Sequence, residues 1–222
     1  MTTKGMFFVI DGTDGSGKAT QTKTLVSRLI ESGQLVDTVA FPQYGKKSAG
    51  PTEDYLAGAY GDPTKIDPRV ASMFYAIDRF AASLDIRRWL EAGHVVVADR
   101  WVSSNMGHQG GKIADPMERR VFLRWNDETE YGLFKIPKPD LTIILHVPAE
   151  IGQQLANQRD GKADGHQKSL QHLKDAEATY LEIAALDPQR FQLIECVKDG
   201  QLLSREDIHR LVWRTIEPLL NR

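Results

Sequence analysis

The sequence predicts an α/β protein with a mostly parallel sheet of five strands and helices on both faces. Five short apolar runs alternate with longer stretches of helical periodicity, and this alternation is typical of a covered parallel sheet. A glycine-rich loop with the spacing Gly-x-x-x-x-Gly-Lys, from Gly12 to Lys18, separates the first apolar run from the first helical stretch. With 222 residues, of which 41% are hydrophobic, the chain has enough material for one core. We therefore expect a single domain over residues 1–222.

The strands and helices are expected in the following order. Pro42 ends the second apolar run, because proline cannot donate a backbone hydrogen bond to a sheet. The clearest helical stretch, residues 68–92, carries an apolar stripe with the spacing of one helix face. The five expected strands are residues 6–10, 35–41, 95–98, 141–147 and 191–194, and the stripe consists of Val70, Phe74, Ile77, Ala81 and Leu84.

The loop that follows the first strand has the spacing of a phosphate cradle, or P-loop. Its glycines permit a turn that points backbone N–H groups inward, and Lys18 is placed to reach the β- and γ-phosphates of a nucleotide. The positive end of the following helix strengthens the same field. Ala19 stands where such loops usually supply a hydroxyl ligand for Mg²⁺, so we expect a water in its place. The expected cofactor-binding residues are Gly12, Thr13, Asp14, Gly15, Ser16, Gly17, Lys18, Ala19 and Thr20.

Composition excludes several classes of partner. The formal net charge is −2, which gives no reason to expect a nucleic-acid polymer or an anionic membrane. No apolar run approaches the length of a membrane span, and the first residues lack the apolar core of a signal peptide. Cys196 is the only cysteine, so no intrachain disulfide forms. We expect a cytoplasmic protein that binds neither nucleic acid nor membrane.

Polar side chains follow the third strand, where ligands of open α/β sheets bind. Asp99 is placed to hold Mg²⁺ or its water, and Arg100 to bind a phosphate; a structural ion pair at the strand end is the alternative. The residues beyond them can hydrogen-bond a nucleobase edge, although a solvated loop explains each one singly. They are Ser103, Ser104, Asn105, His108 and Gln109.

Two other groups suggest nucleotide contacts. Tyr75 and Arg79 are four residues apart and so share a helix face, from which they could stack on and hydrogen-bond a base; an ordinary surface pair fits equally well. The polar stretch 159–166 contains two glycines and is expected to be a short mobile lid. Its Arg159 and Lys162 could close over the transferring phosphates, but a solvated charged loop is the alternative.

Together these motifs identify a resemblance to the thymidylate kinases, a family of P-loop nucleoside monophosphate kinases. The resemblance covers nearly the whole chain. It implies the transfer of the γ-phosphate of ATP to dTMP, giving dTDP and ADP, with Mg²⁺ as cofactor, and a homodimer formed by helix packing. Its most specific pieces are residues 11–18, Phe41-Pro42, Asp78-Arg79 and residues 99–105.

The resemblance also implies roles for individual residues. Asp14 would contact the 3′-hydroxyl of the nucleotide, Tyr75 would stack on thymine, and Arg100 would bind the acceptor phosphate. Arg79 and Asn105 would meet the base, and Phe41, His108 and Gln109 would line the same pocket. The expected catalytic residues are Lys18, Arg100, Asp14 and Arg159, and the expected metal-binding residue is Asp99, with Asp14 as a second possibility.

Two departures from the family pattern change these expectations. Gln43 stands where some relatives carry an arginine that binds the acceptor phosphate, which leaves Lys46 or Lys47 as substitutes. Gly15 stands where other relatives place a catalytic arginine in the phosphate loop, so the lid must supply it, with Arg159 and Lys162 as candidates. Arg159 could instead stack on adenine.

Two rival functions remain open from the sequence. A P-loop kinase for another nucleoside monophosphate or small acceptor would share the phosphate loop and the Asp-Arg pair. A regulatory GTPase would need a guanine-reading Thr-Lys-x-Asp segment after a strand; residues 64–67 match that string, but no strand is expected before them.

Overall fold

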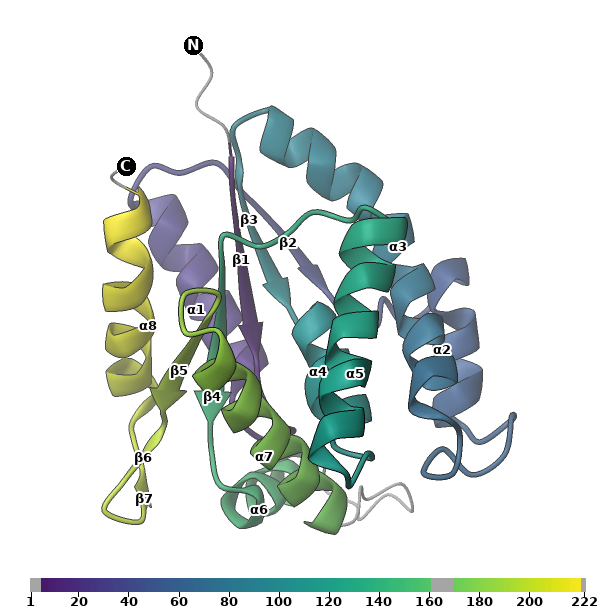
Figure 1. Cartoon of the computed structure of the whole chain (residues 1–222). Coiled ribbons are helices and arrows are strands. Elements are labelled where there is room, and N and C mark those ends of the chain that lie inside the picture. The colour runs from purple at the N-terminus through teal and green to yellow at the C-terminus, as the bar shows by residue number, and fades with distance from the viewer. Residues whose placement is uncertain (1–4, 161–169, 221–222) are drawn as a thin grey trace.

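The apolar runs pair into one five-stranded sheet, which is wholly parallel, as the sequence predicts. In the computed structural model, which describes residues 5–160 and 170–220, the strand order is β2-β3-β1-β4-β5 (Figure 1). Each predicted strand is found within two residues of its expected bounds. The strands are β1 (Met6–Asp11), β2 (Val36–Ala40), β3 (Val95–Asp99), β4 (Leu141–His146) and β5 (Phe191–Glu195).

Two hydrophobic cores cover the two faces of this sheet. Successive side chains of a strand point to opposite faces, so Phe7 and Val9 of β1 enter one core while Phe8 and Ile10 enter the other. All four side chains are fully buried. Because both faces are buried, the central strands are continuously apolar rather than alternating, which explains why they can be recognised in the sequence.

Helices cover each face, as expected for this fold. On one face α1 (Lys18–Glu31) packs beside α8 (Arg205–Leu220). On the other face, residues of four helices pack into the core that contains Phe7 and Val9 (Figure 1). These helices are α3 (Pro68–Glu91), α4 (Val102–Gly110), α5 (Pro116–Asp127) and α7 (Leu170–Leu186).

Local sequence signals account for the starts of two of these helices. Asp67 accepts hydrogen bonds from two backbone N–H groups of the first turn of α3, and Asp115 does the same for α5. In both cases proline occupies the first helical position, where its missing N–H is not needed. The stretch predicted as a helix over residues 68–92 is therefore confirmed to within one residue at its end.

The remaining elements lie mostly at the carboxyl edge of the sheet. They include a π-helix, which inserts one extra residue per turn and occurs mostly at functional sites. A short hairpin, formed by the antiparallel strands β6 and β7, was not expected from the sequence. These elements are η1 (Lys47–Ala49), α2 (Gly50–Leu56), η2 (the π-helix, Glu128–Leu133), α6 (Ala149–Asp160), β6 (Val197–Lys198) and β7 (Gln201–Leu202).

Two further expectations can be compared with the structure. Cys196 is a buried free thiol, and in the described residues no helix has the length and apolar character needed to cross a membrane. The expected lid, residues 159–166, lies largely outside the described part of the chain, which leaves out residues 161–169 and the side chains of Arg159 and Asp160. Its role in the reaction, and that of Lys162, therefore stays a prediction.

Candidate active site

The phosphate loop joins β1 to α1 at the carboxyl edge of the sheet. Gly12, Gly15 and Gly17 have φ angles of 138°, 82° and 86°, which residues with a side chain rarely adopt. Gly17 caps α1, so the N–H groups of the first helical turn open toward the loop. The Oγ of Ser16 is buried without a hydrogen-bond partner in the described chain. This loop therefore offers unpaired donors suited to phosphate oxygens.

Gly15 also lies against the first turns of α6. A Cβ atom built on Gly15 would overlap the carbonyl group of Gly152, and a Cβ atom on Gly152 would come within 2.8 Å of the carbonyl oxygen of Asp14. Neither position has room for a side chain. The contact gives a steric reason why this chain carries no arginine at position 15, and it leaves the catalytic cations to other elements.

Lys18, the first residue of α1, is buried beneath the loop. Its Nζ donates a hydrogen bond to the carbonyl oxygen of Thr13 at 2.8 Å. Burial, assisted by the positive charge of Arg100, lowers the pKa of the Lys18 ammonium to about 7, against the opposing effect of nearby carboxylates. A bound polyphosphate would favour the charged form, so the site is arranged for an anion.

Arg100 lies between the phosphate loop and α4. Its guanidinium forms an ion pair with Asp14 of the loop, and its Nη1 lies 3.2 Å from Nε2 of His108 on α4. The backbone of Arg100 has a φ of 70°, an unusual value for a residue with a side chain, and such strain is commonly found at functional sites. The structure thus brings together three of the predicted site residues, Asp14, Arg100 and His108.

Asp99 ends β3 beside the same loop. Parallel pairing places it next to Ile10 on one side and Ala40 on the other. Burial raises the pKa of the Asp99 carboxyl, while the charges of Lys18 and Arg100 oppose that shift. No hydrogen bond to its carboxylate is found among the described residues, so its oxygens are available to a cation or to water. The described residues contain no cluster of three or more histidine, cysteine or acidic side chains that could hold a metal ion.

Asp11 organises this edge of the sheet, and the sequence did not single out its role. Its fully buried carboxylate accepts hydrogen bonds from Ser103 and Ser104 of α4, from the hydroxyl of Tyr180 on α7 at 2.8 Å, and from the backbone of Gly12. Ser103 and Ser104 were expected among the residues facing a base. Instead they attach α4 to β1, because a buried carboxylate needs several donors.

The predicted base-reading residues form a second, deeper cluster. Arg79 is bound bidentately by Glu130 of η2, with nitrogen–oxygen distances of 2.7 and 2.6 Å, and both side chains are only 1% exposed. Asn105 donates to the carbonyl oxygen of Ser72 at 3.1 Å and to the same carboxylate at 3.3 Å. The structure therefore brings Arg79 and Asn105 together through Glu130. No sequence motif indicated Glu130, which lies 51 residues from Arg79.

Aromatic side chains lie between these two clusters. Burial raises the pKa of the Tyr75 hydroxyl, while the nearby charges of Arg100 and Asp14 act on it in opposite directions. Tyr75 is therefore close enough to the Asp14–Arg100 pair for their fields to matter, and its ring lies edge-on to Tyr55 at 6.0 Å. Gln109 is also buried in this region, and no donor from the described residues reaches its Oε1. A ring on the same edge of the sheet as Arg100 is consistent with the predicted stacking role of Tyr75.

The segment after β2 contains Gln43, which stands where some relatives carry an arginine. Gln43 binds Asp78 of α3 through its backbone N–H at 2.8 Å and its side-chain amide at 3.0 Å, and Lys46 donates to the Oε1 of Gln43 at 2.6 Å. The Phe41 ring is buried against Trp101, 5.1 Å away. Lys46 thus lies next to the side chain that replaces the arginine, as expected of a substitute, whereas Phe41 is part of the core.

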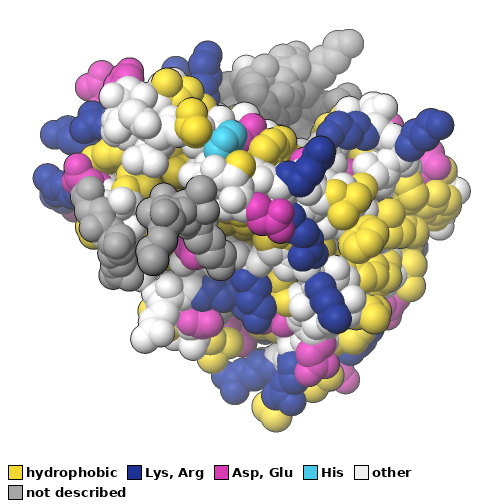
Figure 2. Space-filling view, turned by 90° about the horizontal axis from the view of Figure 1, so that it is seen from above, with side chains coloured by type: hydrophobic (Ala, Val, Ile, Leu, Met, Phe, Trp, Pro, Cys, Tyr) yellow, Lys and Arg dark blue, Asp and Glu magenta, His cyan; other side chains and the backbone are white. Residues whose placement is uncertain are grey.

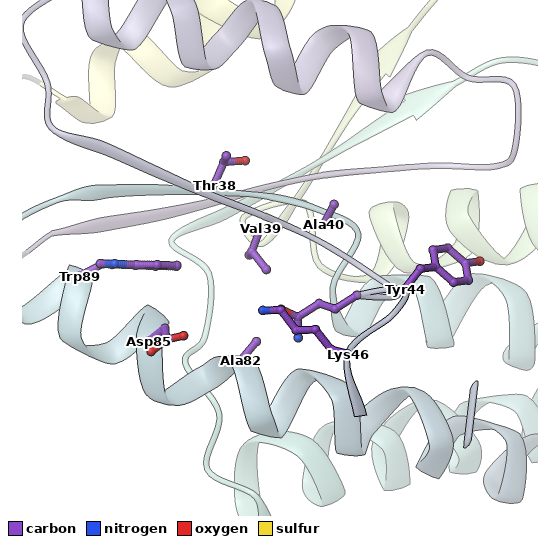
Figure 3. Close-up of a pocket in the computed structure, with 9 residues that line it drawn as sticks. Thr38, Val39, Ala40, Tyr44, Lys46, Ala82, Asp85 and Trp89 are labelled. Atoms are coloured by element: carbon purple, nitrogen blue, oxygen red, sulfur yellow. The ribbon is translucent and has the colours of Figure 1, made fainter. Parts of the chain in front are cut away.

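A pocket of about 300 Å³ lies beside this segment, between the edge strand β2 and α3. Figure 3 shows Trp89 and Asp85 of α3 at one end of the pocket and the Tyr44 ring at the other. None of the phosphate-loop residues lines it. The pocket therefore does not include the phosphate loop.

The Thr-Lys-x-Asp segment, which would bind guanine in a GTPase, has a structural role in this protein. Residues 64–67 form a turn before α3, in which Thr64 donates to Asp62 and Asp67 caps the helix. The segment follows no strand among the described residues. The GTPase alternative therefore has no base-reading site in the position where it needs one.

A parallel sheet of this order, with a phosphate loop after β1 and an Asp-Arg pair after β3, defines a P-loop nucleotide kinase. Comparison with known proteins agrees: a profile of the thymidylate kinase family matches residues 10–206. The chain belongs to the thymidylate kinase family. It is therefore an ATP-dependent nucleoside monophosphate kinase, a transferase.

Individual relatives support this assignment over most of the chain. The thymidylate kinase of Mycobacterium tuberculosis is 31% identical over 186 residues, which cover 81% of this chain and 86% of that protein. The thymidylate kinase of Caulobacter vibrioides is 32% identical, covering 87% and 89%. Among solved structures, thymidylate kinase from Candida albicans has a TM-score of 0.74 at 22% identity, covering 98% of this chain and 93% of that one. This last likeness supports the fold.

Proposed function

We propose that the protein transfers the γ-phosphate of ATP to dTMP, giving ADP and dTDP. The observation that carries the proposal is the position of Arg100, which pairs with Asp14 of the phosphate loop and reaches His108 of the helix that also carries Asn105. An acceptor phosphate held by Arg100 would lie next to a donor phosphate held by Lys18. The buried Arg79–Asn105 cluster then lies deeper on the acceptor side, where a base would follow its phosphate.

The chemistry of the transfer requires positioning and charge neutralisation rather than a general base. A phosphate monoester has a second pKa of about 6 and is therefore largely dianionic, and already nucleophilic, at neutral pH. Lys18 would neutralise charge on the donor phosphates and Arg100 on the acceptor phosphate, in a site that holds the reacting oxygens in line. We expect Asp14, which Arg100 holds, to contact a hydroxyl of the sugar.

We propose Mg²⁺ as the cofactor, held by Asp99 directly or through water. A single well-placed carboxylate suffices, because Mg²⁺ keeps several waters and takes its other ligands from the phosphates. When bound, the ion would neutralise charge on the donor phosphates. The free carboxylate of Asp99 fits this role better than Asp14, which is occupied by Arg100. A rate that does not change when divalent ions are removed with a chelator would contradict the proposal.

The acceptor is tested by measuring ADP release with each deoxynucleoside monophosphate in turn. We expect dTMP to give the highest kcat/KM, with dUMP about 10-fold or more lower, since a pocket that fits one methyl group typically discriminates to this extent. The purine nucleotides should be much poorer. A higher kcat/KM for dGMP or dAMP would contradict the thymidylate assignment while preserving the kinase class.

We also propose a homodimer, formed by the outer face of α3. The stripe predicted on this helix is largely exposed rather than part of the core; Val70, Ile77 and Leu84 are all on the surface. Neighbouring apolar side chains on α5 and η2 extend it into a patch, and Figure 2 shows hydrophobic side chains gathered on the side where α3 lies in Figure 1. Contiguous exposed apolar patches of this kind mark protein–protein contacts. The patch consists of Val70, Ile77, Phe80, Leu84, Met117, Val121 and Leu133.

Sedimentation analysis of the Leu84→Glu variant tests this dimer. We expect the unmodified protein to sediment at about twice its chain mass and the variant at the chain mass, because a buried carboxylate without a partner strongly opposes association. Lys23→Glu, which adds an acid to an exposed position of α1 on the opposite face of the sheet, should remain dimeric. If the unmodified protein sediments as a monomer at micromolar concentration, the dimer proposal is wrong.

A further inference from the structure

The carboxylate of Glu130 holds the side chains of Arg79 and Asn105 at the same time. It accepts from Nε and Nη2 of Arg79 at 2.7 and 2.6 Å, and its Oε1 also lies 3.3 Å from the amide nitrogen of Asn105. All three side chains are at least 98% buried. A guanidinium held along one edge cannot rotate, so its remaining Nη1–H and Nη2–H groups have a fixed direction.

The carbonyl oxygen of Ser72 and the same carboxylate together determine which way the Asn105 amide faces. Oxygen and nitrogen of an amide are assigned from their hydrogen-bond partners. Here the partners on one side are Oδ1 of Asn126 at 3.4 Å, the carbonyl oxygen of Ser72 and the carboxylate of Glu130, and the last two can only accept. The amide nitrogen must therefore face them. Its Oδ1 faces away, and no donor from the described residues reaches it, so it is available as an acceptor.

A donor and an acceptor side by side form a pattern that distinguishes pyrimidine bases. Thymine and uracil present a 4-oxo acceptor next to an N3–H donor, which complements the pair formed by Arg79 and Asn105. Cytosine presents a 4-amino donor next to an N3 acceptor, so both contacts would be repulsive. A site that leaves buried polar groups unpaired rejects a ligand strongly.

We propose that Glu130 is a positioning residue that sets the base specificity of the acceptor site, by holding Arg79 as a donor and Asn105 as an acceptor and so selecting 4-oxo over 4-amino pyrimidines. The inference rests on the proposed dTMP acceptor. Glu130 itself faces away from the base, and it acts through the two side chains that it orients. The location of Glu130 in the π-helix η2 is consistent with a functional origin, because such helices occur mostly at functional sites.

The test is the ratio of kcat/KM for dTMP to kcat/KM for dCMP, measured with the same preparation of each enzyme. This ratio does not depend on the fraction of folded enzyme, so a loss of stability cannot imitate a change in specificity. Glu130→Gln is the main variant, because one of the two oxygens that accept from Arg79 becomes an NH2 group, which is a donor facing a donor. Glu130→Asp keeps an acceptor-only carboxylate, and Glu128→Gln makes the same change at an exposed position of the same helix.

We expect Glu130→Gln to raise the KM for dTMP at least 10-fold with a smaller change in kcat, and to lower the dTMP/dCMP ratio at least 10-fold. The guanidinium of Arg79, no longer bound along one edge by a carboxylate, then loses its fixed direction and with it part of the discrimination against a 4-amino group. Glu130→Asp should raise the KM for dTMP while keeping the ratio within about 3-fold of the unmodified enzyme. Glu128→Gln should leave both constants within 2-fold.

Two results would overturn the proposal. A dTMP/dCMP ratio that is unchanged in Glu130→Gln would show that Glu130 is only a structural partner of Arg79, whatever the loss of activity. A ratio in Glu130→Asp as low as in Glu130→Gln would show that the acceptor-only carboxylate is not what matters. The unmodified enzyme tests the underlying function separately, because it must prefer dTMP before any change in ratio can be interpreted.

Discussion

Replacing Lys18 with methionine should lower kcat by about 100- to 1000-fold, the typical cost of removing one fixed charge or donor from a transition state. We expect the thermal stability of the fold to be preserved. Methionine has a similar length, and a buried ammonium whose pKa is lowered to about 7 opposes folding at neutral pH, so its removal does not destabilise the protein. Turnover and thermal unfolding, measured on the same samples, separate the two effects. Lys23→Met, an exposed position on the same helix, serves as the control.

The same lysine predicts a pH dependence of ATP binding. In the nucleotide-free protein the pKa of Lys18 is about 7, and bound phosphates raise it. At a pH between these two pKa values the complex holds more protons than the free protein. Binding therefore takes up a proton, and the affinity for ATP falls as pH rises. At pH 8 we expect an uptake of about 0.9 proton from this group, measured by calorimetry in two buffers of different ionisation enthalpy. Lys18→Met should abolish it, and an unchanged uptake would assign the proton to another group.

Replacing Arg100 should mainly weaken the binding of the acceptor nucleotide rather than the binding of ATP. We expect Arg100→Met to lower kcat/KM for dTMP by about 100- to 1000-fold, with the KM for ATP within a few-fold of the unmodified enzyme. Arg100→Lys should recover only part of this loss, because a single ammonium cannot bridge Asp14 and a phosphate as a guanidinium does. Initial rates measured over both nucleotide concentrations distinguish these effects.

The control for Arg100 is Arg88→Met, which removes an arginine from an exposed position on α3. It should leave both KM values unchanged. If Arg100→Met raised the KM for ATP as much as that for dTMP, Arg100 would belong to the donor side, and the assignment of the two nucleotide sites would be reversed.

The structure gives a steric reason why position 15 of the phosphate loop carries no arginine. Gly15 lies against Gly152 of α6 with no space for a Cβ atom on either residue. An arginine at position 15 would therefore displace α6, the helix that leads into the predicted lid. Apart from Lys18, the cation that the described residues place at the loop is Arg100, which follows the neighbouring strand β3.

The sequence determined the features that are formed by residues adjacent to one another in the chain. The phosphate loop could be predicted because the positive φ angles of its glycines and the position of Lys18 depend on neighbouring residues alone. The five strands could be predicted because a sheet buried on both faces requires continuous apolar runs. Asp99 and Arg100 could be placed near the loop because the carboxyl ends of parallel strands meet at the same edge.

Contacts between distant segments were decided only by the tertiary structure. The stripe on α3 could equally have been a core face, and only the packing of the opposite face, with Ala76 and Ile86, leaves it exposed. The sequence predicted that Ser103 and Ser104 face a base, whereas the fold places the buried Asp11 beside them, and they donate to its carboxylate. Glu130 had no motif at all, because a bidentate ion pair between residues 51 positions apart leaves no local pattern in either segment. Its place in the site follows from the packing of η2 against α3, which no stretch of the sequence specifies by itself.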